Sequence, residues 1–315
     1  MEPGQIRKHV RLSSYTTLRA GGFAEKLVEV WHSDELGAAA LLAQASEMPT
    51  TVLGAGSNVL PSDDGVPGLT IINRATRIAV ARTGEVLAES GCSFQDLFLK
   101  TAQAGLRGLE FAVGIPGTVG GALVSNAGAY RSCVSEFLTG IEVAHDGKRE
   151  WVDPSWMEFS YRDSILRKSN PPQAAILRVA MKLPLGDPKA IYDEAREYQR
   201  QRIGKQPPSA SAGSFFKNVN DARLAESLET LPIALKKAGV VPAGYLIESA
   251  GLKGFRMGGA MFGKKHANFI LNVGGASAYE IRRLAAHGRG RVRQKFGVDL
   301  EEEVLYLGDW TQFTT

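Results

Sequence analysis

Hydrophobic positions along this chain follow two different periods, which predicts a mixture of strands and helices. Short apolar runs between turn residues predict strands at Lys26–Val30, Thr51–Leu53, Leu69–Asn73, Ile141–Ala144, Arg149–Val152, Ala174–Lys182, within His266–Asn272, and at Val304–Leu307. Helical spacing predicts helices from Ser33 to about Glu47, at Phe94–Ala104, Lys189–Arg202, Pro232–Lys237, Ala243–Ala250 and Ala278–Phe296. Because hairpins around residues 82–85 and 146–148 lie between the helices, this order favours an α+β fold over a doubly wound parallel sheet.

Local signals mark two helix ends and one boundary. Ser33, with Asp34 and Glu35 after it, is typical of an N-cap, and Gly105 is typical of the residue that follows a helix. At 205–212, KQPPSASA, the composition shifts to proline and small residues, which predicts a linker or domain boundary.

The stretch Gly105–Tyr130, GLRGLEFAVGIPGTVGGALVSNAGAY, interrupts the periodic pattern with closely spaced glycines. Each glycine costs a packed helix or strand about 0.5–1 kcal/mol relative to alanine, so this density indicates a backbone that turns tightly and presents N–H groups. Val52–Leu60, VLGAGSNVL, has the same character. Two such loops predict a large, phosphate-bearing cofactor held along its length.

Neither loop matches a common nucleotide motif. Gly54–Asn58 follows a strand, but a third glycine and a long helix are missing, which argues against a Rossmann fingerprint. No Gly-Lys-Ser/Thr is present for a Walker loop. Taken alone, Gly54–Asn58 is slightly more typical of a structural turn than of a phosphate site.

Composition narrows the class of protein. The 315 residues, 44% hydrophobic and 22% charged, suffice for two or three globular domains. No apolar run of about 18 residues predicts a membrane span, and the first residues lack the apolar core of a secretory signal. Cys92 and Cys133 have no metal-ligand spacing, so we expect a reduced, cytoplasmic protein.

The net charge of +4 suits anionic small molecules, and no basic run with interleaved aromatics points to nucleic acid. The local basic cluster Arg289, Arg291, Arg293 and Lys295 is more typical of a solvated helix face.

Three residues are candidates for chemistry, each with an alternative role. Ser214, between Gly213 and two phenylalanines, fits a proton donor in a partly dry pocket, although the residues alone favour a turn hydroxyl. Arg162 fits a carboxylate clamp or, equally, a surface ion pair with Asp163. Glu303 fits a general acid or enolate stabiliser if it points inward, but a solvated strand is favoured. The five histidines show no metal-ligand spacing, so we predict no metal.

Taken together and in order, these motifs resemble the UDP-N-acetylenolpyruvoylglucosamine reductase (MurB) family of peptidoglycan synthesis. The resemblance covers almost the whole chain, through Thr16–Gly22, Val52–Leu60, Gly108–Tyr130, Phe159–Ser164, Gly213–Asn218, Leu246–Gly254, His266–Asn272 and Leu300–Val304. Several collinear motifs are more specific than any one of them, so they outweigh the alternative roles above.

The resemblance implies a fold and a domain order. It implies an FAD-binding fold of the vanillyl-alcohol-oxidase type with two α+β subdomains, followed by an α+β substrate-binding domain. The expected boundaries are 1–76 for the first FAD-binding subdomain, to which 304–315 returns, 77–204 for the second, and 205–303 for the substrate domain.

The resemblance also implies a two-step reduction. NADPH gives a hydride to non-covalently bound FAD, and flavin N5 then gives a hydride to the terminal carbon of the enolpyruvyl ether of UDP-N-acetylglucosamine. Protonation of the adjacent carbon yields UDP-N-acetylmuramate. By the family's motifs, Ser214 is the proton donor, Arg162 holds the substrate carboxylate, and Glu303 is its partner in stabilising the enolate-like intermediate.

The remaining site residues follow from the same motifs. The residues expected to bind FAD are Gly54, Ala55, Gly56, Ser57, Asn58, Val59, Gly114, Pro116, Gly117, Thr118, Gly120, Gly121, Asn126, Ala127, Gly128 and Arg162. Those expected to bind the substrate are Tyr161, Lys205, Lys217, Asn218 and His266. We further expect a monomer and, from the composition described above, a cytoplasmic protein that neither binds nucleic acid nor inserts into membranes.

The chain departs from the family at four places. Between Arg162 and Gly213 it lacks a tyrosine-bearing insertion of some members, so other residues must close over the substrate diphosphate. His266 replaces a glutamine, Leu305 a common arginine, and Val219 a frequent proline. These differences affect substrate binding more than the three catalytic candidates.

Two rival functions stay open. A flavin oxidase or dehydrogenase of the same cofactor fold often attaches FAD through histidine, but neither glycine-rich loop contains one. A sugar- or nucleotide-binding regulator that lost its activity would not need Ser214, Arg162 and Glu303 together.

Overall fold

The computed structural model describes residues 4–314, except for the side chain of Lys205, and these residues form two compact units. The first unit consists of residues up to Val10, Ala24–Ala55 and Pro67–Gly204. The second consists of Arg11–Phe23, Gly56–Val66 and the chain from Lys205 onward. The second unit is therefore assembled from three separate segments of the sequence, and its longest segment starts at the proline-containing stretch KQPPSASA.

The first unit holds most of the regular structure before the boundary at Lys205. Its helices are α1 (Ser33–Ala45), α2 (Phe94–Gln103), α3 (Val119–Val124) and α4 (Pro188–Lys205). Its strands are β1 (Arg7–Arg11), β2 (Phe23–Val30), β3 (Thr50–Leu53), β5 (Val66–Asn73), β6 (Ile78–Val80), β7 (Glu85–Glu89), β8 (Gly128–Ala129), β9 (Ser132–Cys133), β10 (Leu138–His145), β11 (Lys148–Val152) and β12 (Ala174–Lys182).

Two sheets organise this unit. One has the order β1-β2-β5-β3, in which β3 and β5 run parallel. The other has the order β11-β10-β12-β7-β6 and its neighbouring strands pair antiparallel. The expected hairpins are confirmed, since β6 pairs with β7 and β10 with β11. This mixture of pairings confirms the α+β fold class.

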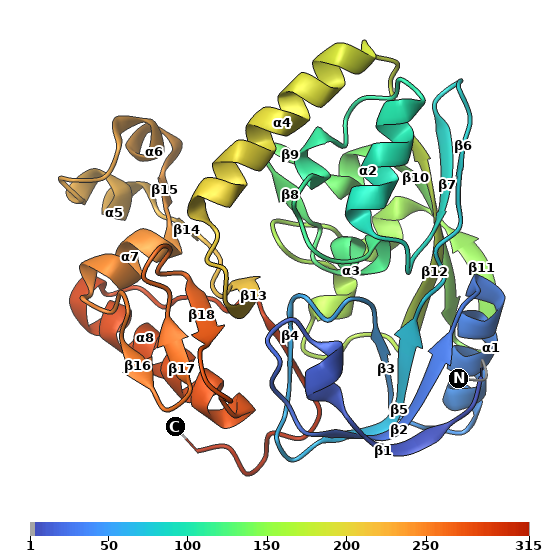
Figure 1. Ribbon diagram of the computed structural model, residues 1–315, viewed down its shortest axis with the longest axis horizontal. Coiled ribbons are helices and arrows are strands. Elements are labelled where there is room, and N and C mark those ends of the chain that lie inside the picture. The colour runs from blue at the N-terminus through green and yellow to red at the C-terminus, as the bar shows by residue number, and fades with distance from the viewer. Residues whose placement is uncertain (1–3, 315) are drawn as a thin grey trace. The chain divides into compact units, whose positions relative to one another are not determined.

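The five-stranded sheet is covered on both faces (Figure 1). On one face, α1 packs Leu36 and Ala40 against Leu177 of β12 in an apolar cluster shared with the other sheet. On the opposite face, Phe94 and Phe98 of α2 and residues of α3 and α4 pack against β7, β10 and β12. Alternating side chains of β12 reach the two faces, which explains its almost unbroken apolar sequence.

The second unit contains shorter elements and one long helix. Its strands are β4 (Val59–Pro61), β13 (Ala210–Ser214), β14 (Val219–Asn220), β15 (Val240–Val241), β16 (Arg256–Met257), β17 (Ala260–Phe262), β18 (Phe269–Asn272) and β19 (Leu305–Leu307). Its helices are α5 (Ala222–Ser227), α6 (Ile233–Ala238), α7 (Ala243–Ser249) and α8 (Ala278–Phe296).

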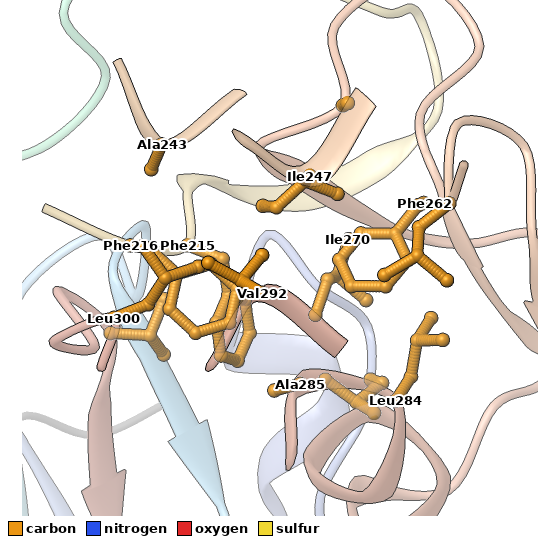
Figure 2. Packing of buried hydrophobic residues seen from close by; sticks show 14 of the residues in the cluster. Phe215, Phe216, Ala243, Ile247, Phe262, Ile270, Leu284, Ala285, Val292 and Leu300 are labelled. Atoms are coloured by element: carbon orange, nitrogen blue, oxygen red, sulfur yellow. The ribbon is translucent and has the colours of Figure 1, made fainter. Parts of the chain in front are cut away.

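A four-stranded sheet, β13-β18-β17-β16, packs against α8 in this unit. Figure 2 shows the resulting core, in which Phe215 and Phe216 lie in one cluster with Val292 of α8 and with Leu300. Parallel pairing of β19 with β4 joins the C-terminal strand to residues 59–61. The core therefore holds the segments on either side of Ser214 and Glu303.

Most predicted element bounds are confirmed to within a few residues, but the predicted cap at Ser33 is wrong. His32 occupies the N-cap position in an extended conformation, and Ser33 is the first residue of α1. The Ser33 N–H instead donates to Glu89 Oε1 at 3.0 Å. A carboxylate from a distant strand satisfies this helix end, and local sequence cannot reveal that partner.

Two further features concern the surface. Arg289, Arg291, Arg293 and Lys295 are exposed along α8, as predicted for a solvated helix face. Of the helices within residues 4–314, none combines the length and apolar character that crossing a membrane requires.

Candidate active site

The two glycine-rich segments touch each other within the first unit, at Gly54 and Thr118. A Cβ placed on Gly54 would lie only 2.3 Å from Thr118 Oγ1, so this close approach requires glycine. Thr118 is the N-cap of α3, and its Oγ1 accepts from the Gly121 N–H at 3.3 Å. The contact therefore fixes the start of α3 against the end of β3.

The rest of the 114–128 segment is held by backbone contacts. The Gly120 N–H donates to Ser90 O at 2.7 Å, and a Cβ on Gly120 would lie 3.0 Å from Ser90 Cβ. Gly117 has a φ of 136°, in a region that disfavours side chains. Asn126 also adopts a positive φ, 41°, and is 8% exposed. The predicted cofactor residues Gly114, Pro116, Ala127 and Gly128 belong to this same ordered segment.

Asn126 carries an unsatisfied polar atom. Its Nδ2 donates to Ser160 O at 3.1 Å, while its buried Oδ1 has no hydrogen-bond partner within residues 4–314. Buried polar atoms in folded proteins are nearly always paired. Asn126 Oδ1 is therefore available to a donor from outside the chain.

Arg162 lies at a tight turn beside this segment. Ser160 and Asp163 pair as an isolated antiparallel bridge, with Tyr161 and Arg162 at the tip. Arg162 has a φ of 54° and donates through Nη2 to the carbonyl of Gly128. Its Cζ also lies 5.8 Å from the centre of the half-exposed Tyr161 ring. The structure thus brings Tyr161, Arg162 and the glycine-rich segment together.

Arg202, at the C-terminal end of α4, is a further cation that sequence reasoning missed. Its Nη2 donates to Phe111 O at 3.2 Å, and its Cζ lies 5.6 Å from the centre of the Tyr130 ring. Tyr130 in turn stacks on Tyr198, with ring centres 3.7 Å apart. The one available signal was the four-residue spacing of Tyr198 and Arg202, which places both on one helix face.

The surroundings of Arg202 lower the pKa of its guanidinium below the ordinary value. Burial lowers the pKa of its guanidinium, Tyr130 opposes this effect, and nearby Arg162 adds to it. Its Nε is buried and has no hydrogen-bond partner among the described residues. Two neighbouring cations and an unpaired N–H favour an anionic or strongly accepting ligand at this position.

The second half of the first glycine-rich loop, Gly56–Val59, belongs to the second unit. A Cβ on Gly56 would lie 2.0 Å from Tyr15 O, and the Thr17 N–H donates to Gly56 O at 3.0 Å. Asn58 Nδ2 donates to Glu303 O at 3.2 Å, and Val59 begins β4. The loop is therefore divided, since Gly54 and Ala55 belong to the first unit.

Ser214 and Glu303 lie on adjoining backbone segments. Ser214 ends β13 and is half-buried, and the next residue, Phe215, accepts at its carbonyl from the Glu303 N–H at 2.8 Å. Phe216 and Glu302 form an isolated antiparallel bridge. Two predicted catalytic residues from distant parts of the sequence are thus held in one short stretch of pairing.

The predicted substrate residues of the second unit have defined partners. Lys217 is 8% exposed and forms an ion pair with Glu301. Asn218 Oδ1 accepts from the Ala243 N–H at 3.2 Å, and His266 Nδ1 accepts from the Asn268 N–H at 3.3 Å. The side chain of Lys205 lies outside the described residues.

No metal cluster accompanies these residues. Throughout residues 4–314, no three or more histidine, cysteine, aspartate or glutamate side chains gather where they could hold a metal ion.

Comparison with known families matches two parts of the chain. Residues 24–152 match the family described as FAD binding domain. Residues 205–307 match the family described as UDP-N-acetylenolpyruvoylglucosamine reductase, C-terminal domain.

Full-length relatives carry the same description. The UDP-N-acetylenolpyruvoylglucosamine reductase of Rubrobacter xylanophilus is 40% identical over 299 residues, which cover 95% of this chain and 94% of the relative. That of Nostoc punctiforme is 36% identical over 310 residues, 97% of this chain and 87% of the relative. The crystal structure of the Thermus caldophilus reductase (MurB) superposes with a TM-score of 0.76 at 35% identity, covering 96% of this chain and all of that one.

Proposed function

The chain belongs to the UDP-N-acetylenolpyruvoylglucosamine reductase (MurB) family of oxidoreductases, and from this premise we propose that it reduces the enolpyruvyl ether of UDP-N-acetylglucosamine to UDP-N-acetylmuramate, with NADPH as reductant. The observation that carries the proposal is the hydrogen bond from the Glu303 N–H to Phe215 O at 2.8 Å. It joins the segment that contains Glu303 to the residue after Ser214. The motif residues of one reaction step are therefore neighbours in the fold.

The second glycine-rich segment, Gly114–Gly128, and the arginines beside it fit FAD. Asn126 Oδ1 is a buried acceptor in need of a donor, and a flavin ring provides N–H groups. Arg162 and Arg202 provide positive charge beside the same glycine-rich segment, which suits the cofactor's phosphates or its carbonyl-rich ring edge. We assign FAD to Gly54–Val59 and to Gly114, Pro116, Gly117, Thr118, Gly120, Gly121, Asn126, Ala127, Gly128 and Arg162, bound without a covalent link. When bound, FAD carries a hydride from NADPH to the terminal carbon of the substrate double bond.

The protein's own residues complete the reduction at the adjacent carbon. Arg162 holds the substrate carboxylate with its planar guanidinium, so negative charge that develops on this group meets a fixed cation. Ser214 donates a proton to the carbon next to the carboxylate. One hydride and one proton thus add across the double bond, and both substrate carbons become saturated.

We assign Glu303 to the same reaction step. We propose that its side chain is the partner of Arg162 in stabilising the enolate-like intermediate. A serine hydroxyl is a weak acid, so Ser214 needs polar neighbours that return a proton to it after each turnover. The fixed backbone of Glu303 supports this role, because both its N–H and its carbonyl have partners, Phe215 O and Asn58 Nδ2.

The remaining substrate contacts follow from the family's motifs. We assign Tyr161, Lys205, Lys217, Asn218 and His266 to the nucleotide and diphosphate end of the substrate. Lys217 pairs with the largely exposed Glu301, so a diphosphate would compete with this carboxylate. Cys92 and Cys133 are free thiols, which suits a protein working in the reducing cytoplasm, and we propose that it works there as a monomer.

The product of an anaerobic incubation tests this function. Purified protein is mixed with NADPH and UDP-N-acetylglucosamine enolpyruvate, and the nucleotide products are analysed by mass spectrometry. We expect a product heavier than the substrate by two hydrogens, one NADPH consumed for each product, and flavin released when the protein is denatured. A protein that retains flavin but leaves the enolpyruvyl ether unchanged would refute the proposed substrate.

A further inference from the structure

Asn268 immediately precedes β18 and is almost fully buried, with 3% of its surface exposed. Its side chain makes two hydrogen bonds to a single residue, Phe216. Oδ1 accepts from the Phe216 N–H at 2.9 Å, and Nδ2 donates to Phe216 O at 2.8 Å. A carboxamide has the donor and acceptor of a peptide group, so Asn268 pairs with Phe216 as a neighbouring strand would.

The Asn268 side chain extends the hydrogen bonding between β13 and β18 by one residue beyond the last backbone pairs. Strand β13 pairs with β18 up to Ser214, which lies opposite Phe269, and the register is irregular between Ser211 and Ser214. Beyond Ser214, the carbonyl of Asn268 accepts from the Phe215 N–H at 2.7 Å, and its carboxamide binds the next residue. The chain therefore stays extended and held directly after Ser214.

The opposite edge of the same segment is held by the acidic triplet. Phe215 O accepts from the Glu303 N–H at 2.8 Å, and the Lys217 N–H donates to Glu301 O at 2.8 Å. The segment from Phe215 to Lys217 thus lies between Asn268 on one edge and the residues around Glu303 on the other. Release of one edge would let Ser214 move relative to Glu303.

We propose that Asn268 is a positioning residue for the protonation step, acting through Phe216 to fix Ser214 relative to Glu303. This inference rests on the proposed function, since it assigns Asn268 no contact with substrate or cofactor. Misplacement of a catalytic group by about 1 Å can cost on the order of a hundredfold in rate. Loss of the carboxamide should therefore slow the step that uses Ser214 and leave flavin reduction by NADPH unchanged.

The variants Asn268→Ala and Asn268→Asp test this role in anaerobic stopped-flow experiments that separate the two half-reactions. In Asn268→Ala, flavin reduction should stay within about twofold of wild type, while reoxidation by the enolpyruvyl substrate should slow by about 10- to 100-fold. Asn268→Asp adds a pH signature. A protonated carboxyl group can both donate and accept as the carboxamide does, whereas the ionised form cannot donate to Phe216 O.

The direction of this pH effect is defined. Burial and the nearby carbonyl raise the pKa of the introduced carboxyl above its ordinary value. Reoxidation by Asn268→Asp should therefore be fastest below that raised pKa and decline as the pH rises through it, a titration absent from wild type. Asn272→Asp is the matched control, because Asn272 ends the strand β18 that Asn268 precedes, but its Nδ2 donates to Leu18 O and Arg19 O. It should show no selective loss of reoxidation.

A second readout needs neither substrate nor cofactor. Residue-resolved hydrogen exchange should show the Phe216 N–H exchanging at least about tenfold faster in Asn268→Ala, because its acceptor Oδ1 is gone. Equal losses in both half-reactions, the same pH profile for both aspartate variants, or unchanged Phe216 exchange would each overturn the inference. Failure of wild-type protein to be reoxidised would instead refute the proposed function and this role with it.

Discussion

Arg162 is held in a backbone conformation that few residues other than glycine adopt. Its φ of 54° lies in the left-handed region, which costs a non-glycine residue on the order of 1–3 kcal/mol unless its surroundings compensate. The bridge between Ser160 and Asp163 closes the turn, and Ser164 Oγ donates to Val124 O at 2.7 Å. The strain is thus anchored to the end of α3, beside the segment assigned to FAD.

The first residue-scale prediction concerns Ser214. Ser214→Ala removes the proposed proton donor and leaves the backbone pairing intact. Flavin reduction by NADPH should stay near wild type, while reoxidation by the enolpyruvyl substrate should fall by about 10²–10³, the usual cost of removing such a group. Ser211→Ala, on the same strand, is the control and should keep both rates. An equal loss in both half-reactions would indicate a structural role for Ser214.

The second prediction concerns Glu303, and substitution of the neighbouring Glu302 serves as its control. Glu303→Gln keeps the side-chain size and should slow reoxidation by about 10²-fold, because an amide cannot give and take a proton beside the enolate-like intermediate as a carboxyl group does. Glu302→Gln changes the neighbouring residue, whose carboxylate lies 3.9 Å from Arg289 Nη1, and should leave reoxidation within about threefold of wild type. Equal effects of the two substitutions would remove Glu303 from the mechanism.

Sequence alone identified Ser214, Arg162 and Glu303 as candidates because each lies in a distinctive motif, and their roles remain predictions. It missed Arg202 and Asn268 for a physical reason. Arg202 donates to the carbonyl of Phe111 and Asn268 pairs with the peptide group of Phe216, so the hydrogen-bond partner of each is a backbone group that no motif displays. Backbone partners from distant segments become visible only once the chain is folded.

At the scale of the element, α8 places two glycines in opposite environments. Gly288 is buried, and a Cβ there would lie 2.6 Å from the tip of the Phe262 ring, whereas a Cβ on Gly290 meets nothing within 4 Å. The close approach of α8 to β17 therefore requires glycine at position 288 but not at position 290.

The matched pair Gly288→Ala and Gly290→Ala tests this packing. Gly290→Ala should stabilise the protein by about 0.5–1 kcal/mol, because alanine is the better helix former. Gly288→Ala should destabilise it, since crowding against Phe262 costs about 1–3 kcal/mol, which exceeds the helix gain. Urea unfolding curves of both variants measure the difference. Stabilisation by both substitutions would contradict the packing described for α8.

Elements were the most predictable level of this fold. The strand β12 and the helix α8 were predicted to the residue, because long periodic runs with clear end signals leave few alternatives. The N-cap of α1 was predicted to be Ser33 but is His32. The Ser33 N–H donates to the carboxylate of Glu89, a residue far along the chain that local sequence does not reveal. Pairing partners such as β4 and β19 could not be read from local pattern.

At the scale of the whole molecule, stability should depend on a buried ionic network in the first unit. The Glu142 carboxylate, with 5% of its side chain exposed, accepts from Arg149 Nε at 2.6 Å and from Arg178. Burial raises the pKa of Glu142, but hydrogen bonds from Arg178 and Arg149 outweigh it and lower the pKa below its ordinary value of 4.5. The ionised form is therefore favoured in the folded protein.

This shift predicts a pH-dependent loss of stability. A lowered folded-state pKa stabilises the protein fully above pH 4.5, and the contribution is lost as the pH falls through the folded-state value. Glu142→Gln should cost about 1–3 kcal/mol at pH 7, and this cost should shrink below pH 4.5. Glu150→Gln, a more exposed carboxylate on the adjoining strand, should cost less than about 1 kcal/mol at pH 7. Unfolding midpoints measured across pH decide between these outcomes; a cost for Glu142→Gln that does not change with pH would contradict the assignment.

The organisation of the whole molecule was the hardest feature to predict from the sequence. The α+β class followed from the mixture of elements, but the second unit combines three distant segments, and its assembly depends on contacts such as that between Asn58 and Glu303. The three-domain division expected from the sequence remains a prediction.

The central claim is that one chain performs both halves of a flavin-mediated reduction. Anaerobic double-mixing stopped flow tests it directly: the protein is mixed first with NADPH and then with UDP-N-acetylglucosamine enolpyruvate, while absorbance is followed in the flavin band. We expect bleaching in the first step and full recovery of colour in the second, at a rate that rises with the concentration of the enolpyruvyl substrate. A flavin that is bleached by NADPH and stays bleached in the presence of that substrate would contradict it.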